Sequence, residues 1–487
     1  MTDHALGVLR RHPRLAALAA FPFDFDLDRA AHGHVEAVRL ASGGPLEVIA
    51  GDDTGGTFFR CGDGSVLYAS SEGAAGIIGS SVDEALDILT GLPGWADYID
   101  LAPQDGEEAI HEAVAETEDS LRESYGIDEE RAELRAALGF PERSPMELIG
   151  LLHAALLRTE PGFVLLNADE GRAYRLLDRH PRPGLWEPVL ASGRAGLAAL
   201  RDGEDEAWRA TEQDPVRRRL VLRAAQFDRR DADLPLLRRL LRQEAGSSMT
   251  DELRLAAVLV GLGGRPEDLP LLNEVRETDF DTACGLGGMP APDADGPALL
   301  AWARELDESM FGTDPADEPL GTWTGLAADQ GLTEYARVPL IRRLDEIELN
   351  QGLLRDPRDP DRLNPGPLRS LAYDFDRLGD LPQALRAQRL CSALQDTAWD
   401  RVSSLRDLAE LERRSGEPAA AARTLARLRA VLDAPDDTLA YWHRVNLGRF
   451  IVREHESVAE ALRDAGESGL AADLSEAANG VRARLSS

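Results

Sequence analysis

Residues 219–237 read RLVLRAAQFDRRDADLPLL, and residues 254–272 read RLAAVLVGLGGRPEDLPLL. The opening Arg-Leu and the closing Asp-Leu-Pro-Leu-Leu of the two stretches match at a constant offset of 35 residues. Similarity at a fixed period of this length is typical of stacked supersecondary units. The repeat therefore predicts an array of such units in the C-terminal two-thirds of the chain.

Each copy of the repeat has the pattern of two helices. The first helix carries an apolar stripe that includes Leu220 in one copy and Leu255 in the next. The second begins at Asp233 or Asp268, where we expect the carboxylate to act as N-cap, with a proline inside the first turn. A helix pair with one apolar stripe cannot bury it alone, so we expect neighbouring copies to share a core.

A second array follows. Five residues recur after 37 positions: Leu368, Leu371, Ala372, Gly379 and Ala384 become Leu405, Leu408, Ala409, Gly416 and Ala421. The small residues stand where two helices approach closely, and each glycine marks a turn. Residues 211–345 resemble HEAT-type repeats, and residues 346–487 look like tetratricopeptide units. The resemblance implies an α-solenoid that presents surface to a partner.

The N-terminal part has strand patterns. Residues 46–50, 56–60 and 65–70 read as strands, and Asp63-Gly64 is a hairpin turn between the last two. Ser81 then opens a helix with acidic residues in its first turn. The pattern predicts a small α+β domain with a mixed or antiparallel sheet.

Residues 46–99 resemble the SUKH superfamily. The segments that carry the resemblance are IAGDDTGGTFF, GDGSVLYASSEG and the helix SVDEALDILTGLPGW. The family implies a non-enzymatic α/β recognition fold, which in bacteria is often an immunity protein that neutralises a cognate toxin.

The whole chain is therefore expected to be mostly α, with an α+β domain followed by a helical-repeat region. We predict five segments: 1–100, a SUKH-like domain; 101–145, an acidic linker or helix; 146–210, a helical connector; 211–345, HEAT-like repeats; and 346–487, tetratricopeptide-like repeats. Residues 163–167 could form a strand or a buried piece of helix.

Composition excludes several function classes. All 54 basic residues are arginine, so no reaction that needs a catalytic or phosphate-binding lysine is available. The net charge of −33 argues against binding to nucleic acid or to an anionic membrane. The simpler interpretation of this acidity is that it keeps the chain soluble, and the alternative is that it serves a basic partner. No apolar run reaches the length of a membrane span, and the three cysteines are too few and too separated for a disulfide framework. We expect a cytoplasmic protein.

The sequence contains no motif that predicts a catalytic residue, a cofactor site or a metal site. The glycine-rich residues 258–264 lack the third glycine of a dinucleotide-binding turn, because Pro266 stands there. The candidate partner-binding residues are Asp52 and Asp53, an exposed pair at a hairpin, and Arg218 and Arg239 in an arginine-rich ridge. The simpler interpretation of the two aspartates is that aspartate favours turn positions. The simpler interpretation of the two arginines is that they pair with neighbouring acidic residues.

These observations favour a non-catalytic protein that binds another protein, with toxin neutralisation as its most specific form. One alternative is a scaffold or adaptor in a larger bacterial assembly. Another is a hydrolase whose carboxylates form no recognisable motif. The oligomeric state stays open.

Overall fold

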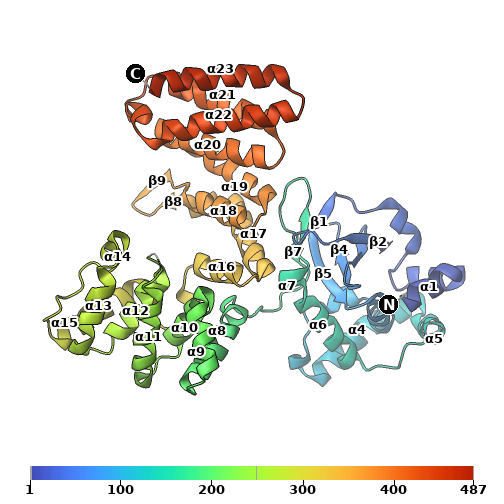
Figure 1. Cartoon of the computed structure of the whole chain (residues 1–487). Coiled ribbons are helices and arrows are strands. Elements are labelled where there is room, and N and C mark those ends of the chain that lie inside the picture. Colours follow the sequence, from blue (N-terminus) through green and yellow to red (C-terminus); the bar gives the residue numbers. More distant parts are fainter. Residues whose placement is uncertain (1–2, 248, 486–487) are drawn as a thin grey trace. The chain divides into compact units, whose positions relative to one another are not determined.

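The computed structural model describes residues 3–247 and 249–485. The chain forms two compact units, of which the first comprises Met1–Pro181 together with Arg337–Ser487, and the second Arg182–Ala336. The predicted fold class is confirmed, because a small N-terminal mixed sheet precedes a mainly helical region (Figure 1). No helix in the described part of the chain is both long enough and apolar enough to cross a membrane.

The sheet of the first unit has five strands in the order β2-β3-β4-β5-β7. The first four pair antiparallel, and β7 pairs parallel with β5. A separate antiparallel pair joins β1 and β6. The strands are β1 (Val38–Leu40), β2 (Leu46–Gly51), β3 (Thr57–Cys61), β4 (Val66–Ala69), β5 (Ala74–Gly79), β6 (Leu165–Asn167) and β7 (Arg175–Leu176).

Neighbouring side chains on β3 enter different cores, because successive residues of a strand point to opposite faces. Phe58 packs with helix residues such as Leu86 and Ile149. Phe59 packs on the other face with Leu165 of β6. The surrounding helices are α1 (His4–Arg11), α2 (Pro13–Ala20), α3 (Val82–Gly91), α4 (Glu107–Tyr125), α5 (Ile127–Leu138), α6 (Pro145–Leu157) and α7 (Thr159–Gly162).

Local sequence signals account for several boundaries of these elements. Gly64 has φ +94° in the β3–β4 turn, and the Asp63 carboxylate accepts a hydrogen bond of 3.0 Å from the Ser65 amide. Ser81 caps α3 by accepting from the Glu84 amide, at 3.1 Å. Such caps satisfy amides that a helix terminus leaves without a partner.

The α/β part of the first unit extends beyond the predicted 1–100 segment. Residues 101–145 fold into α4 and α5, whose Ile110 and Leu134 join the core beneath the sheet. Residues 146–210 supply α6 and also the strands β6 and β7, so this segment is not purely helical. Residues 163–167, which the sequence left undecided, contain β6.

The rest of the first unit consists of consecutive helices and one short hairpin. Gly379, Gly416 and Gly466 follow α18, α20 and α22 with φ between +74° and +82°, a backbone conformation that ends a helix most cheaply at glycine. In Figure 1, α20 to α23 lie side by side. The elements are α17 (Thr333–Leu349), β8 (Arg355–Asp356), β9 (Asp359–Leu363), α18 (Gly366–Arg377), α19 (Leu381–Ala393), α20 (Ala398–Arg414), α21 (Pro418–Asp433), α22 (Asn446–Asp464) and α23 (Ser468–Leu485).

The second unit contains the 35-residue repeat. The two copies form the helix pairs α10–α11 and α12–α13, and the leucines of both pairs share one core. The helices are α8 (Trp186–Arg201), α9 (Asp205–Gln213), α10 (Pro215–Phe227), α11 (Leu234–Glu244), α12 (Asp251–Gly261), α13 (Leu269–Arg276), α14 (Phe280–Gly285), α15 (Gly296–Leu306) and α16 (Leu320–Asp329).

The expected side-chain caps of α11 and α13 are wrong in one respect. Asp233 and Asp268 stand at the N-cap positions, but neither carboxylate accepts a capping hydrogen bond. Asp233 instead accepts from Arg201 at 2.6 Å, and Asp268 accepts from Arg238 at 2.9 Å. A guanidinium forms charge-assisted, bidentate hydrogen bonds with a carboxylate, which are stronger than a hydrogen bond from a neutral amide. Asp233 and Asp268 therefore bind arginines of the earlier helices α8 and α11.

Candidate functional site

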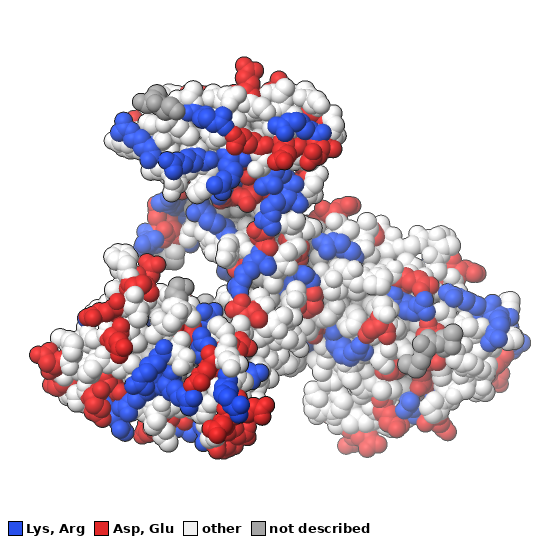
Figure 2. Space-filling model, viewed as in Figure 1, with Lys and Arg blue, Asp and Glu red and all other residues white. Residues whose placement is uncertain are grey.

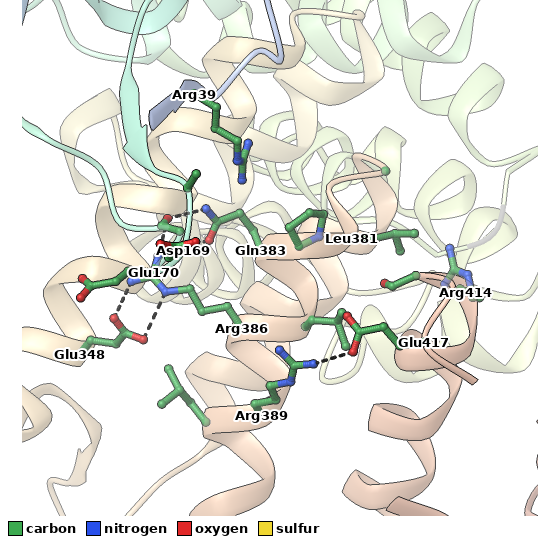
Figure 3. A pocket seen from close by; sticks show the side chains of 17 residues that line it. Arg39, Asp169, Glu170, Glu348, Leu381, Gln383, Arg386, Arg389, Arg414 and Glu417 are labelled. Atoms are coloured by element: carbon green, nitrogen blue, oxygen red, sulfur yellow. Dashed lines mark hydrogen bonds and ion pairs between the residues drawn. The ribbon is translucent and has the colours of Figure 1, made fainter. Parts of the chain in front are cut away.

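The hollow drawn in Figure 3 lies in the first unit and has a volume of about 700 Å³. It is bounded by the turn of residues 168–171, by the end of α17, by α19 and by the turn between α20 and α21. We call it the arginine hollow after the four arginines that line it: Arg39, Arg386, Arg389 and Arg414.

Arg386 holds three parts of the first unit together. Its Nη1 donates to the carbonyl oxygen of Gly171 at 2.9 Å, and its Nη2 donates to Asp345 at 2.6 Å. Its Nε donates to Glu348 at 3.2 Å. Burial alone would raise the pKa of Glu348, but Arg386 and Arg172 outweigh that effect and hold the pKa below its ordinary value. Glu348 therefore stays ionised as the partner of both guanidinium groups.

The remaining arginines of the hollow differ in their partners. Arg389 pairs with Glu417 at 3.3 Å, and Arg414 pairs with Asp376 at 2.7 Å. Arg39 points from β1 toward the hollow (Figure 3) and forms no ion pair with the residues that the structure describes. Since a guanidinium keeps its proton at any physiological pH, these groups can bind anions but cannot carry out acid–base catalysis.

A second arginine-rich surface lies on α18, α20 and α22. Phe450 of α22 is 42% exposed, and its ring centre lies 5.6 Å from the Arg406 guanidinium and 6.0 Å from that of Arg453. Tyr373 of α18 is 68% exposed and lines a groove of about 300 Å³ between α18 and α20, together with Arg369. We call these five residues the arginine–aromatic face.

The charges of this face are only partly compensated. Arg406 pairs with Asp407 and, at 3.2 Å, with Glu410. Burial raises the pKa of Asp407, and the neighbouring Arg406 opposes that shift. Arg453 has no ion-pair partner within the described ranges. Figure 2 shows arginine side chains gathered over the C-terminal helices, in a chain that is strongly acidic overall.

The predicted aspartate pair is not an exposed pair. Asp52 is only 6% exposed, and its carboxylate accepts hydrogen bonds from the Gly56 amide at 2.7 Å and the Tyr68 hydroxyl at 2.6 Å. Asp53 is exposed beside it in the turn. Asp52 therefore holds the β2–β3 turn together, as the turn-chemistry interpretation supposed.

The two predicted arginines lie in the second unit, whereas Asp52 and Asp53 lie in the first. Arg218 is 5% exposed and pairs with Glu244 at 3.1 Å. Arg239 lies 3.9 Å from the ring centre of Trp208 and also pairs with Glu212. Both side chains bind neighbouring helices of their own unit.

The sequence contained a weak signal for the arginine–aromatic face. Tyr373 falls outside the apolar stripe formed by Leu368, Leu371 and Phe375, which indicates a solvent-facing aromatic. Phe450, in contrast, adjoins the buried Ile451 and reads as part of an apolar run. Its proximity to Arg406, on another helix, follows only from the packing of α20 against α22.

No protein-family model matches this chain, and no curated protein matches it in sequence.

Proposed function

We propose that this chain is a non-catalytic protein that binds another protein through the arginine–aromatic face. The observation that carries the proposal is the exposed Phe450 ring, whose centre lies 5.6 Å from the Arg406 guanidinium and 6.0 Å from that of Arg453. Tyrosine and arginine are the side chains enriched at the energetic centres of protein interfaces. Tyr373 on α18 and Phe450 on α22 are exposed aromatics of this kind, each beside arginine side chains.

The charge of the face indicates what part of a partner it would contact. Arg453 carries a positive charge that no described acid neutralises, and Arg406 lies across the same ring. Carboxylates of the partner could form charge-assisted hydrogen bonds with these guanidinium groups. We expect the bound segment to be acidic, although the chain as a whole favours basic partners.

Affinity capture with paired variants tests this function. The full chain would be immobilised and exposed to lysate of the cells that produce it, alongside the double variant Tyr373→Ala/Phe450→Ala. The matched control is Phe21→Ala/Tyr125→Ala, which removes two exposed aromatics from the α/β part. We expect at least one protein to be retained by the unchanged chain and the control and lost with the first variant. Equal retention by all three would contradict the proposal.

The resemblance of residues 46–99 to the SUKH superfamily gives the proposal its most specific form, toxin neutralisation. It is supported by the antiparallel strands β2 to β5, which α3 follows directly. Co-expression with a toxin-like reading frame encoded beside this gene would test it. Rescue of growth is the expected result, and unrelieved toxicity would count against immunity without affecting protein binding in general.

A further inference from the structure

A groove of about 840 Å³ lies in the second unit between α8, α9 and α10. Small side chains form most of its floor, so the groove is open to the larger side chains of another molecule. The floor residues are Ala195, Gly196, Ala199, Ala207, Ala210 and Leu220.

The depth of the groove is fixed by how closely α8 and α10 pack. A Cβ atom at Gly193 would lie 2.4 Å from the carbonyl oxygen of Leu220, so only glycine permits this approach. At Gly196, one turn further along, a Cβ would lie 3.0 Å from Val221. The helices are therefore in direct backbone contact below the groove and cannot close it by moving together.

Thr211 provides an independent sign that the groove takes a ligand. The residue is 1% exposed and lines the groove, and its hydroxyl has no hydrogen-bond partner among the residues that the structure describes. A hydrogen-bonding group of a bound molecule would supply the partner that this hydroxyl lacks within the described chain.

The rim of the groove is acidic. Glu204, Glu206, Asp214 and Asp329 stand around it, against the single cation Arg217. Neither Glu204 nor Glu206 forms an ion pair with a described residue. Such a rim repels phosphates and carboxylates, and it attracts lysine and arginine side chains.

We propose that this groove is a docking site for a basic segment of a partner protein. An apolar side chain of that segment lies on the alanine floor, a polar group reaches the Thr211 hydroxyl, and a lysine or arginine pairs with Glu204 or Glu206. This site is distinct from the arginine–aromatic face, because it belongs to the other unit and selects the opposite charge.

Two synthetic peptides serve as probes, and fluorescence anisotropy with the full chain measures their binding. Both carry the same lysines in the same positions. One has leucine and alanine between them, and the other has serine and glycine. If the apolar floor is used, we expect the first peptide to bind roughly tenfold more tightly, which corresponds to about 1.4 kcal/mol. Equal affinities would overturn the proposal, since an acidic chain attracts any polycation.

Matched variants then locate the binding. Glu204→Gln/Glu206→Gln and Glu267→Gln/Glu277→Gln each remove two negative charges, but only the first pair stands on the groove. Likewise, Ala195→Trp fills the groove, whereas Ala198→Trp changes an exposed position of the same helix outside it. We expect only the groove variants to weaken binding of the leucine-containing peptide, by roughly fivefold for the charge pair and more for the tryptophan. Equal effects of groove and control variants would overturn the proposal.

A second copy of this chain is the competing occupant. Light scattering of the purified chain and of Ala195→Trp tests it directly. A dimer that the tryptophan dissociates would overturn the proposal, and an unchanged molecular mass would support it. Because none of these measurements involves Tyr373 or Phe450, failure here leaves the function proposed for the arginine–aromatic face intact.

Discussion

Arg386 donates a hydrogen bond of 2.9 Å to the carbonyl oxygen of Gly171, although 215 residues separate them in the sequence. Through this contact the helix α19 holds the turn between two strands of the α/β part. Gln383, on the same helix face, donates to the same oxygen at 2.6 Å. The two parts of the first unit are thus joined by directed polar bonds as well as by apolar packing.

Replacement of Arg386 by alanine should destabilise the first unit. The change leaves Asp345 without its guanidinium and Glu348 with Arg172 alone, and breaking a largely buried ion pair costs about 3 kcal/mol. Arg389→Ala is the matched control, because Arg389 and its partner Glu417 are both about half exposed, and such pairs contribute less than about 1 kcal/mol. Urea unfolding of the full chain measures both. If both variants lost the same free energy of unfolding, Arg386 would contribute no more to stability than a surface arginine.

Asp24 should make the α/β part less stable as the pH rises. Burial, reinforced by Asp53 and Asp52, raises the pKa of Asp24 from 3.8 to about 6. The folded chain then holds this proton more tightly than the unfolded chain does, so the free energy of unfolding falls between pH 4 and pH 6.

Asp24→Asn removes this titration. Asn also tolerates the left-handed backbone of residue 24, whose φ is +56°. The stability difference between the variant and the unchanged chain should therefore grow in the variant's favour from pH 4.5 to pH 7, in urea titrations at each pH. A difference that does not vary with pH would show that Asp24 titrates normally.

Thr211→Val should leave the stability of the second unit unchanged or raise it by less than about 1 kcal/mol, since it replaces a hydroxyl that pairs with no described residue by a methyl group of the same shape. Both residues are β-branched, so the helix propensity of α9 changes little. Thermal unfolding followed by circular dichroism is the measurement. A loss of stability instead would mean that the hydroxyl has a partner in solution, such as an ordered water molecule.

Two glycine-to-alanine changes should have opposite signs. Gly193→Ala places a Cβ against the backbone of Leu220, so α8 and α10 must separate, and we expect a loss of about 2 kcal/mol. Gly321→Ala, within α16, meets no atom within 4 Å. It should stabilise the chain by roughly 0.5–1 kcal/mol, because alanine is the better helix former. Melting temperatures that move in the same direction would contradict the close approach at Gly193.

Local signals predicted much of the secondary structure. The Asp63-Gly64 turn and the Ser81 cap stand where the sequence indicated. Each depends on atoms a few residues apart, so the local sequence is sufficient to specify it. The side-chain role of Asp233 could not be predicted in this way. Its carboxylate accepts a hydrogen bond from Arg201, which lies on another helix, 32 residues earlier in the sequence.

The candidate sites were predicted less well for the same reason. Asp52 looked exposed because its neighbours in sequence are turn residues, yet Tyr68 from another strand covers it. Phe450 directly precedes the buried Ile451 in the sequence, yet its own side chain is 42% exposed. Burial of one side chain is decided by whichever segment packs over it.

The amino-acid sequence alone indicates helix pairs, from the 35-residue repeat, and hairpins, from the alternation of apolar residues and the turn residues. It also specifies an acidic, lysine-free composition. These follow from backbone geometry and composition, which act between near neighbours. Three features required the folded structure. These are the pairing of β6 and β7 with the N-terminal strands, the identity of the arginines that have no ion-pair partner among the described residues, and the groove beside Thr211. Those outcomes depend on contacts between distant segments, whose geometry no local pattern contains.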